Sequence, residues 1–146
     1  MIDQRTAPYA ALLLRVSLGV MFVAHGLLLK VFTFTVPGTV GYFESLGYPG
    51  FFAYLVILGE VGGGLALILG TWTRTVSLLL LPIMIGATLQ HVGAGWTFSN
   101  PGGGWEFPVF WTVALVVQAL LGSGAWAFRP ETLLPGLVPA PSHRSH

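Results

Sequence analysis

Four long apolar stretches, separated by short polar segments, dominate the sequence. Each is close to the roughly 20 residues that an α-helix needs to cross a bilayer. The pattern predicts spans over Pro8–Leu29, Phe51–Leu69, Thr75–Val92 and Glu106–Trp126. The first stretch is too long for the apolar core of a signal peptide and lacks a clear small-residue cleavage site, so we interpret it as a retained span.

The connections between these spans differ in character. Between the first two spans, turn signals flank Thr39–Leu46, for which we expect a short helix lying at the membrane interface. Residues 93–105 contain five glycines and no charge, which predicts a flexible surface loop. Residues 129–146 form a proline-rich tail, for which we expect an extended or disordered chain.

Composition supports a membrane class. Hydrophobic residues make up 54% of the 146 residues and charged residues only 8%, with a mean hydropathy of +0.80. A soluble domain carries about 25% charged residues, so this surface suits lipid better than water. The predicted architecture is all-α: residues 1–128 form one domain, a four-helix transmembrane bundle with a short interfacial helix between its first two spans.

Charge and cysteine content narrow the function classes. A net charge of +1 provides no nucleic-acid footprint, and the absence of cysteine excludes thiol chemistry in this chain. Because cytoplasmic segments carry the excess of Lys and Arg, both termini are predicted to be cytoplasmic, with Lys30 on the outer side. The cytoplasmic side would hold four arginines, too scattered for a lipid-binding polybasic cluster: Arg5, Arg74, Arg129 and Arg144.

Ionisable residues within or at the ends of the spans need an explanation, since a charge at the centre of a spanning helix costs about 2.5–3.5 kcal/mol. There are five: Arg15, His25, Glu60, His91 and Glu106. At about 100° per residue, one face of the first span carries Arg15, Gly19, Phe22 and Gly26. Arg15 and Glu60 lie within one or two turns of the same depth, which predicts an ion pair. A purely architectural pair that sets helix register is the alternative interpretation.

The remaining ionisable residues lie toward the outer ends of their spans. We expect one inward-facing pocket, open to the outer side and with Lys30 or Gln90 at its rim, to collect His25, Glu60, His91 and Glu106. Each alone has a structural explanation. His91 and Glu106 lie where water can solvate them, and the helix dipole favours a carboxylate at the start of a span. The coincidence of four groups at one end carries the inference.

Small and aromatic residues add two expectations. Gly59 and Gly63 form a G-x-x-x-G pair, for which packing within the bundle is favoured over a dimer face. Tryptophan and phenylalanine residues predict an outer aromatic belt of Trp96, Trp105, Phe107 and Trp111 and an inner one of Trp72 and Trp126. Trp105, beside Glu106, is also a candidate pocket wall.

Four segments carry a family resemblance: LLLRVSLGVMFVAHGLLLKVF, YFESLGYPG, ILGEVGGGLALILGTWTR and GGGWEFPVFW. Over roughly residues 8–128 the chain resembles the DoxX family of small four-helix bacterial membrane proteins. The resemblance implies a multi-pass protein of the bacterial cytoplasmic (inner) membrane. One member of that family is described as part of a thiosulfate-oxidising, quinone-reducing membrane enzyme, and others as oxidoreductases or partners in oxidative-stress complexes. It therefore implies a quinone-linked redox role.

The leading interpretation is an oxidoreductase, or the membrane subunit of a redox complex, that binds a quinone. Candidate catalytic residues, which would hydrogen-bond the quinone oxygens and shuttle protons, are His25, Glu60, His91 and Glu106. Candidate cofactor-binding residues are Arg15, His25, His91 and Trp105. No residue here carries electrons unaided, so catalysis would need a bound cofactor or a redox partner protein.

Three alternatives stay open. Haem could be ligated by His25 and His91 across the bundle. A histidine–carboxylate metal site lacks the Glu-x-x-His repeats of di-iron bundles, so no metal ligands are assigned. A non-catalytic scaffold or binding protein for a redox or stress-response partner would tolerate loss of both histidines, whereas an enzyme would not. The substrate, the partner and the oligomeric state are left open.

Overall fold

The computed structural model describes residues 1–129, and this part of the chain contains five α-helices and no strand. In order, the helices are α1 (Ala7–Val23), η1 (Ala24–Thr33), α2 (Val36–Ser45), α3 (Phe51–Leu69), α4 (Thr73–His91), η2 (Val92–Ala94) and α5 (Glu106–Leu121). The predicted all-α class is confirmed for these residues. The prediction of an extended or disordered tail falls, from residue 130 onward, outside the described part.

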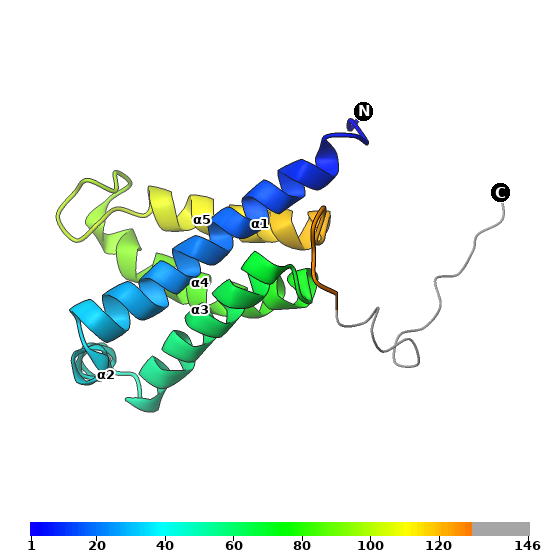
Figure 1. The fold of residues 1–146 in the computed structure, drawn as a ribbon. Coiled ribbons are helices and arrows are strands. Elements are labelled where there is room, and N and C mark those ends of the chain that lie inside the picture. The colour runs from blue at the N-terminus through cyan, green and yellow to red at the C-terminus, as the bar shows by residue number, and fades with distance from the viewer. Residues whose placement is uncertain (130–146) are drawn as a thin grey trace.

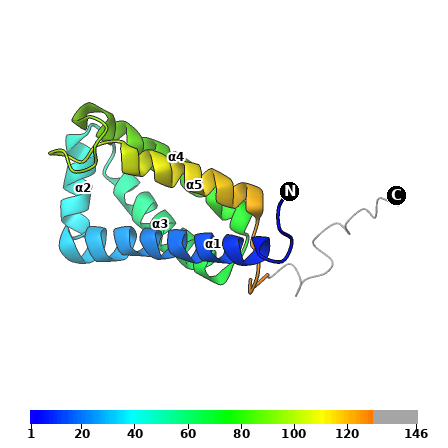
Figure 2. The same cartoon turned by 90° about the horizontal axis from the view of Figure 1, so that it is seen from above.

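The long helices pack as two antiparallel pairs that cross each other (Figure 1). Helix α1 lies on α3 and α5 lies on α4, and the pairs meet where α3 packs on α4 and α1 on α5. Figure 2 places α2 and the loop of residues 93–105 at one end of the molecule, here called the α2 end. The N-terminus and residues 122–129 lie at the opposite end, here called the N-terminal end.

Three helical segments are long and apolar enough to cross a membrane: Ala7–Thr33, Phe51–Leu69 and Thr73–Ala94. Helix α5 is also apolar but has only 16 residues, and it ends at Leu121 instead of the predicted Trp126. Gly122 has a φ of 80°, a backbone conformation that stops the helix.

The first apolar helix is longer than predicted, and its second half is not α-helical. It runs without a break for 27 residues, and Ala24–Thr33 form a π-helix. Hydrogen bonds from residue i to i+5 bring residues five apart onto one face, which the 3.6-residue turn of an α-helix does not do. His25 and Lys30 therefore share a face of η1.

Helices α1 and α3 touch backbone to backbone at two glycines. A Cβ on Gly19 would lie 2.6 Å from the Gly64 carbonyl oxygen, and a Cβ on Gly64 would lie 2.7 Å from that of Gly19. The predicted G-x-x-x-G pair, Gly59 and Gly63, instead faces side chains of α4. Packing within the bundle, the favoured interpretation of this pair, is therefore confirmed.

We expect Gly64→Val to destabilise the protein by about 1–3 kcal/mol, the usual cost of overpacking. The new side chain would collide with the backbone of α1, since its Cβ would also lie 2.9 Å from the Val23 nitrogen. Chemical or thermal unfolding in detergent measures the loss. Gly62→Val, in the same helix, is the matched control, because a Cβ there meets nothing within 4 Å. Equal destabilisation by both variants would contradict the close helix crossing.

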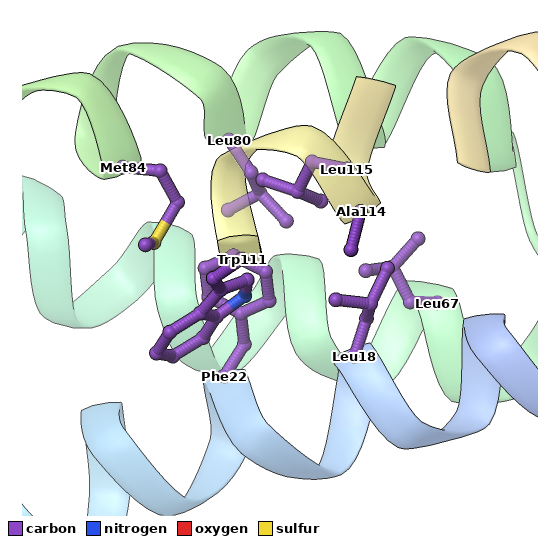
Figure 3. Close-up of a cluster of buried hydrophobic side chains, with 8 residues drawn as sticks. All are labelled: Leu18, Phe22, Leu67, Leu80, Met84, Trp111, Ala114 and Leu115. Carbon is purple, nitrogen blue, oxygen red and sulfur yellow. The ribbon is translucent and has the colours of Figure 1, made fainter. Parts of the chain in front are cut away.

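The core joins α1, α3, α4 and α5. Eight buried side chains form it (Figure 3): Leu18, Phe22, Leu67, Leu80, Met84, Trp111, Ala114 and Leu115. Trp111 is only 5% exposed, so its predicted place in the outer aromatic belt is wrong. The reason is helical spacing, since Trp111, Ala114 and Leu115 fall on the inward stripe of α5. Trp96 and Trp105 are exposed.

Candidate functional site

A buried ion pair joins η1 to the middle of α3. The Nζ of Lys30 donates to both carboxylate oxygens of Glu60, at 2.9 and 3.0 Å. Glu60 is 5% exposed, so its charge would be very costly without this partner. Lys30, predicted at the rim of a pocket, is the residue that neutralises Glu60.

The backbone of η1 lies directly against Glu60, because Gly26 has no side chain. A Cβ on Gly26 would lie 2.9 Å from the Cβ of Glu60 and 2.8 Å from the Cγ2 of Val61. His25 lies within electrostatic range of the same carboxylate. The π-helix and this glycine therefore bring Lys30, and the backbone next to His25, against Glu60.

The predicted Arg15–Glu60 ion pair is wrong. Arg15 is completely buried, and its guanidinium donates at 2.7–3.4 Å to five backbone carbonyl oxygens, those of Leu67, Ile68, Ser123, Ala125 and Trp126. Its contact with α3 is about 10 Å along the helix from Glu60. The last carbonyl groups of a helix lack intrahelical donors and carry the negative end of the dipole, which suits a cation.

Arg15 ties the segment after α5 to the rest of the bundle. Two further hydrogen bonds support the same connection: Ser123 Oγ donates to Thr73 Oγ1 at 2.9 Å, and the Ala125 N–H donates to the Pro8 carbonyl at 3.0 Å. This geometry gives Arg15 a structural role at the N-terminal end. Its predicted cofactor-binding role stays a prediction.

His25 is oriented by its own helix and packed against Trp111. Its Nδ1 lies 2.8 Å from the Met21 carbonyl oxygen. A carbonyl only accepts, so we assign the proton to Nδ1, which leaves Nε2 for another partner. The His25 and Trp111 rings meet edge to face, with centroids 4.8 Å apart.

The indole nitrogen of Trp111 is buried and, within residues 1–129, has no hydrogen-bond partner. A buried donor without a partner is uncommon in proteins, because leaving it unpaired costs about 1–3 kcal/mol. The indole ring that carries this nitrogen contacts His25. Within the described part of the chain, Nε2 of His25 also has no hydrogen-bond partner. Together they offer an unused donor and an unused acceptor in neighbouring rings.

His91 braces the loop at the α2 end. Its Nδ1 lies 2.6 Å from the Gly103 carbonyl oxygen and 3.1 Å from that of Gly102. Backbone hydrogen bonds cross the loop from Gly104 to Thr97, from Trp105 to Gly95 and from Glu106 to Trp96. The loop prediction is thus confirmed, but the segment is held by cross-bonds that its glycine content did not predict. Glu106 is an exposed residue that opens α5.

The four residues predicted to line one pocket do not all contact one another. Glu60 lies with His25, whereas His91 binds the loop and Glu106 is exposed. In residues 1–129 no three His, Asp or Glu side chains come together as they would around a metal ion. Three aromatic rings in successive contact connect His25 to His91: Trp111, Phe107 and Phe98. Along this series, from His25 to His91, neighbouring ring centroids are 4.8, 5.7, 5.2 and 6.2 Å apart.

An all-helical chain with three long apolar helices, and with a charged pair enclosed between two of them, is a membrane protein. It belongs to the DoxX family, whose model matches residues 10–99. Over 78 residues, 53% of the chain, it is 40% identical to a Bacillus subtilis protein named "Putative oxidoreductase CatD". Over 41 residues, 28% of the chain, it is 56% identical to the Escherichia coli protein "Inner membrane protein YqjF".

These matches span 56% and 32% of the relatives' own lengths. No solved structure matches the chain significantly. The family resemblance carried by the span residues is therefore confirmed, and one of the two relatives is named as an inner membrane protein.

Proposed function

We propose that this protein is a membrane oxidoreductase, or the membrane subunit of a redox complex, that binds a quinone beside His25 and Trp111. The observation that carries the proposal is the buried, unpaired indole N–H of Trp111, next to an oriented histidine. A quinone is an apolar ring with carbonyl oxygens, so it would fill an aromatic site while accepting this hydrogen bond. The name of the Bacillus relative supports the oxidoreductase class.

The proposal includes a bilayer arrangement in the bacterial inner membrane. Helix α5 would be the fourth span, although its 16 residues rise only about 24 Å against a core of about 30 Å. Local thinning of the bilayer would accommodate that difference. Arg5, Arg74 and Arg129 would lie on the cytoplasmic side with both termini, which places α2 at the outer interface.

A bound quinone would supply the electron-transfer chemistry that the side chains of this protein lack. Trp111 would donate its indole proton in a hydrogen bond to one oxygen. Protonated His25 would donate from Nε2 to the second quinone oxygen, and neutral His25 would accept there from a quinol hydroxyl, while the Met21 carbonyl holds Nδ1 in place. Lys30 is 20% exposed, so the Lys30–Glu60 pair would link His25 to the surface for proton exchange.

Binding of decylubiquinone to the detergent-purified protein, followed by titration calorimetry, tests the proposal. We expect saturable binding that weakens about tenfold in Trp111→Phe, which removes one hydrogen bond, and similarly in His25→Ala. Trp96→Phe, at a tryptophan 63% exposed in the outer loop, is the control and should bind normally. Absence of saturable binding, or equal affinity in all variants, would leave the non-catalytic scaffold as the better interpretation.

Two further measurements address the other candidate residues and cofactors. Quinone-dependent activity in membranes should be lost in the His25→Ala/His91→Ala double variant at normal expression, and a scaffold would be unaffected. Glu106→Gln tests the remaining catalytic candidate in the same assay. An absorption band of haem that shifts on dithionite reduction, and disappears with either histidine, would replace the quinone proposal by haem ligation.

A further inference from the structure

A second candidate site lies at the N-terminal end, opposite the His25 cluster. A hollow of about 330 Å³ is enclosed by the start of α4 and the segment that follows α5. Its lining includes the arginines Arg74 and Arg129 and the hydroxyl-bearing residues Thr73, Thr75 and Ser123. These arginines are 55 positions apart in the sequence, and the fold brings them to one hollow.

Arg74 lies over the backbone at the end of α5. A Cβ on Gly122 would lie 3.0 Å from Arg74 Nε and 3.1 Å from Nη2, so the glycine leaves room for the guanidinium. Within residues 1–129, the acidic residues other than Asp3 are Glu44, Glu60 and Glu106. Glu60 lies in the middle of α3, and the other two lie at the α2 end. Asp3 already accepts from the Arg5 N–H. Arg74 and Arg129 contribute positive charge to the lining of the hollow.

The first turn of α4 adds to this positive potential. The helix has 19 residues, no side-chain N-cap and no acidic residue in its first turn. Its first N–H groups and the positive end of its dipole therefore lie at the hollow, together with the arginines. This combination of guanidinium groups and backbone donors suits the oxygens of a phosphate.

Exposed tryptophans place the hollow at the depth of lipid headgroups. Trp72, which lines it, is 59% exposed, and Trp126 at the same end is 82% exposed. Tryptophan is enriched where the hydrocarbon core meets the headgroups. We infer that the hollow binds the phosphate of an anionic phospholipid, with Arg74 and the start of α4 as the principal donors. This site is separate from the proposed quinone site.

Native mass spectrometry of the protein in neutral detergent micelles tests this inference, with phosphatidylglycerol and phosphatidylcholine as probes. We expect one phosphatidylglycerol to bind more tightly than phosphatidylcholine, and Arg74→Gln to weaken it at least about tenfold. Arg74→Lys keeps the charge but loses the planar guanidinium, so its affinity for phosphatidylglycerol should lie between those of the unchanged protein and Arg74→Gln. Arg5→Gln removes an equal charge at the same end and should bind normally, because Arg5 is exposed and does not line the hollow.

The outcomes separate the possible sources of the phosphate. If inorganic phosphate competes with phosphatidylglycerol, the phosphate group is the part of the lipid that is recognised. If inorganic phosphate binds in an Arg74-dependent way and the lipid does not bind, the site serves a soluble phosphate. Equal retention of the two lipids without phosphate binding, or equal weakening by Arg74→Gln and Arg5→Gln, would overturn the inference. Decylubiquinone binding should be unchanged in Arg74→Gln, so failure here would not affect the proposed function.

Discussion

Replacing Arg15 by methionine is expected to destabilise the protein by about 3–5 kcal/mol, because several buried carbonyl groups lose a donor at once. Methionine fills much of the same space but donates no hydrogen bond. The carbonyl oxygens that now accept from Arg15 would lose this donor, although Leu67 would keep the Gly70 N–H, and each group left unsatisfied costs about 1–3 kcal/mol. Thermal unfolding of the detergent-solubilised variant, followed by circular dichroism, measures the loss.

The position of the lost contacts makes this test specific. Arg5→Met, at an exposed arginine of the same end, should leave unfolding unchanged. We also expect residues 122–128 of Arg15→Met to be cleaved faster by protease, because two of their carbonyl groups accept its strongest bonds to that segment. Stability equal to that of Arg5→Met would show that water replaces the guanidinium.

Removing Lys30 alone should cost about 3–5 kcal/mol of folding stability, since it leaves the Glu60 carboxylate buried without its partner. Removing both charges should be far less harmful. We therefore expect Lys30→Met to be strongly destabilised and Lys30→Met/Glu60→Met to recover most of the loss, because an apolar pair replaces a buried ion pair at little cost. A double-mutant cycle on the unfolding free energies, with Glu60→Met as the fourth corner, measures the coupling.

The same cycle distinguishes two roles for this ion pair. A pair that only sets helix register would leave a folded double variant with normal decylubiquinone affinity and activity. A pair that also delivers protons to His25 would leave affinity close to normal but lower quinone-dependent activity. Additive destabilisation by the two single changes would contradict direct coupling of Lys30 and Glu60.

Several features of the fold follow from sequence pattern alone. The apolar lengths predicted the long helices, and 100° spacing correctly assigned Arg15, Gly19, Phe22 and Gly26 to one face, all of them buried. These predictions succeed because they depend on local periodicity and on the cost of exposing charge to lipid, both of which act along a single helix.

The ion-pair partners were not predictable in this way. Depth along a helix axis made Arg15 and Glu60 seem adjacent, but the pairing depends on which faces meet where α1 and α3 cross. That crossing is set by the backbone contact of Gly19 with Gly64. The π-helical turn that brings Lys30 onto the face of His25 was not predictable either, because the apolar pattern of this stretch does not distinguish i→i+4 from i→i+5 hydrogen bonding. In the structure this turn is packed against α3 at Gly26.

The sequence by itself determined a helical membrane protein of the DoxX family, its principal apolar helices and the ionisable residues that need partners. Only the tertiary structure decided that Lys30 neutralises Glu60, that Arg15 binds backbone carbonyls and that Trp111 lies in the core beside His25. Periodicity defines the inward face of each helix. Partners across a helix interface depend instead on crossing angle and axial register, which emerge only when glycine contacts and buried polar groups are satisfied together.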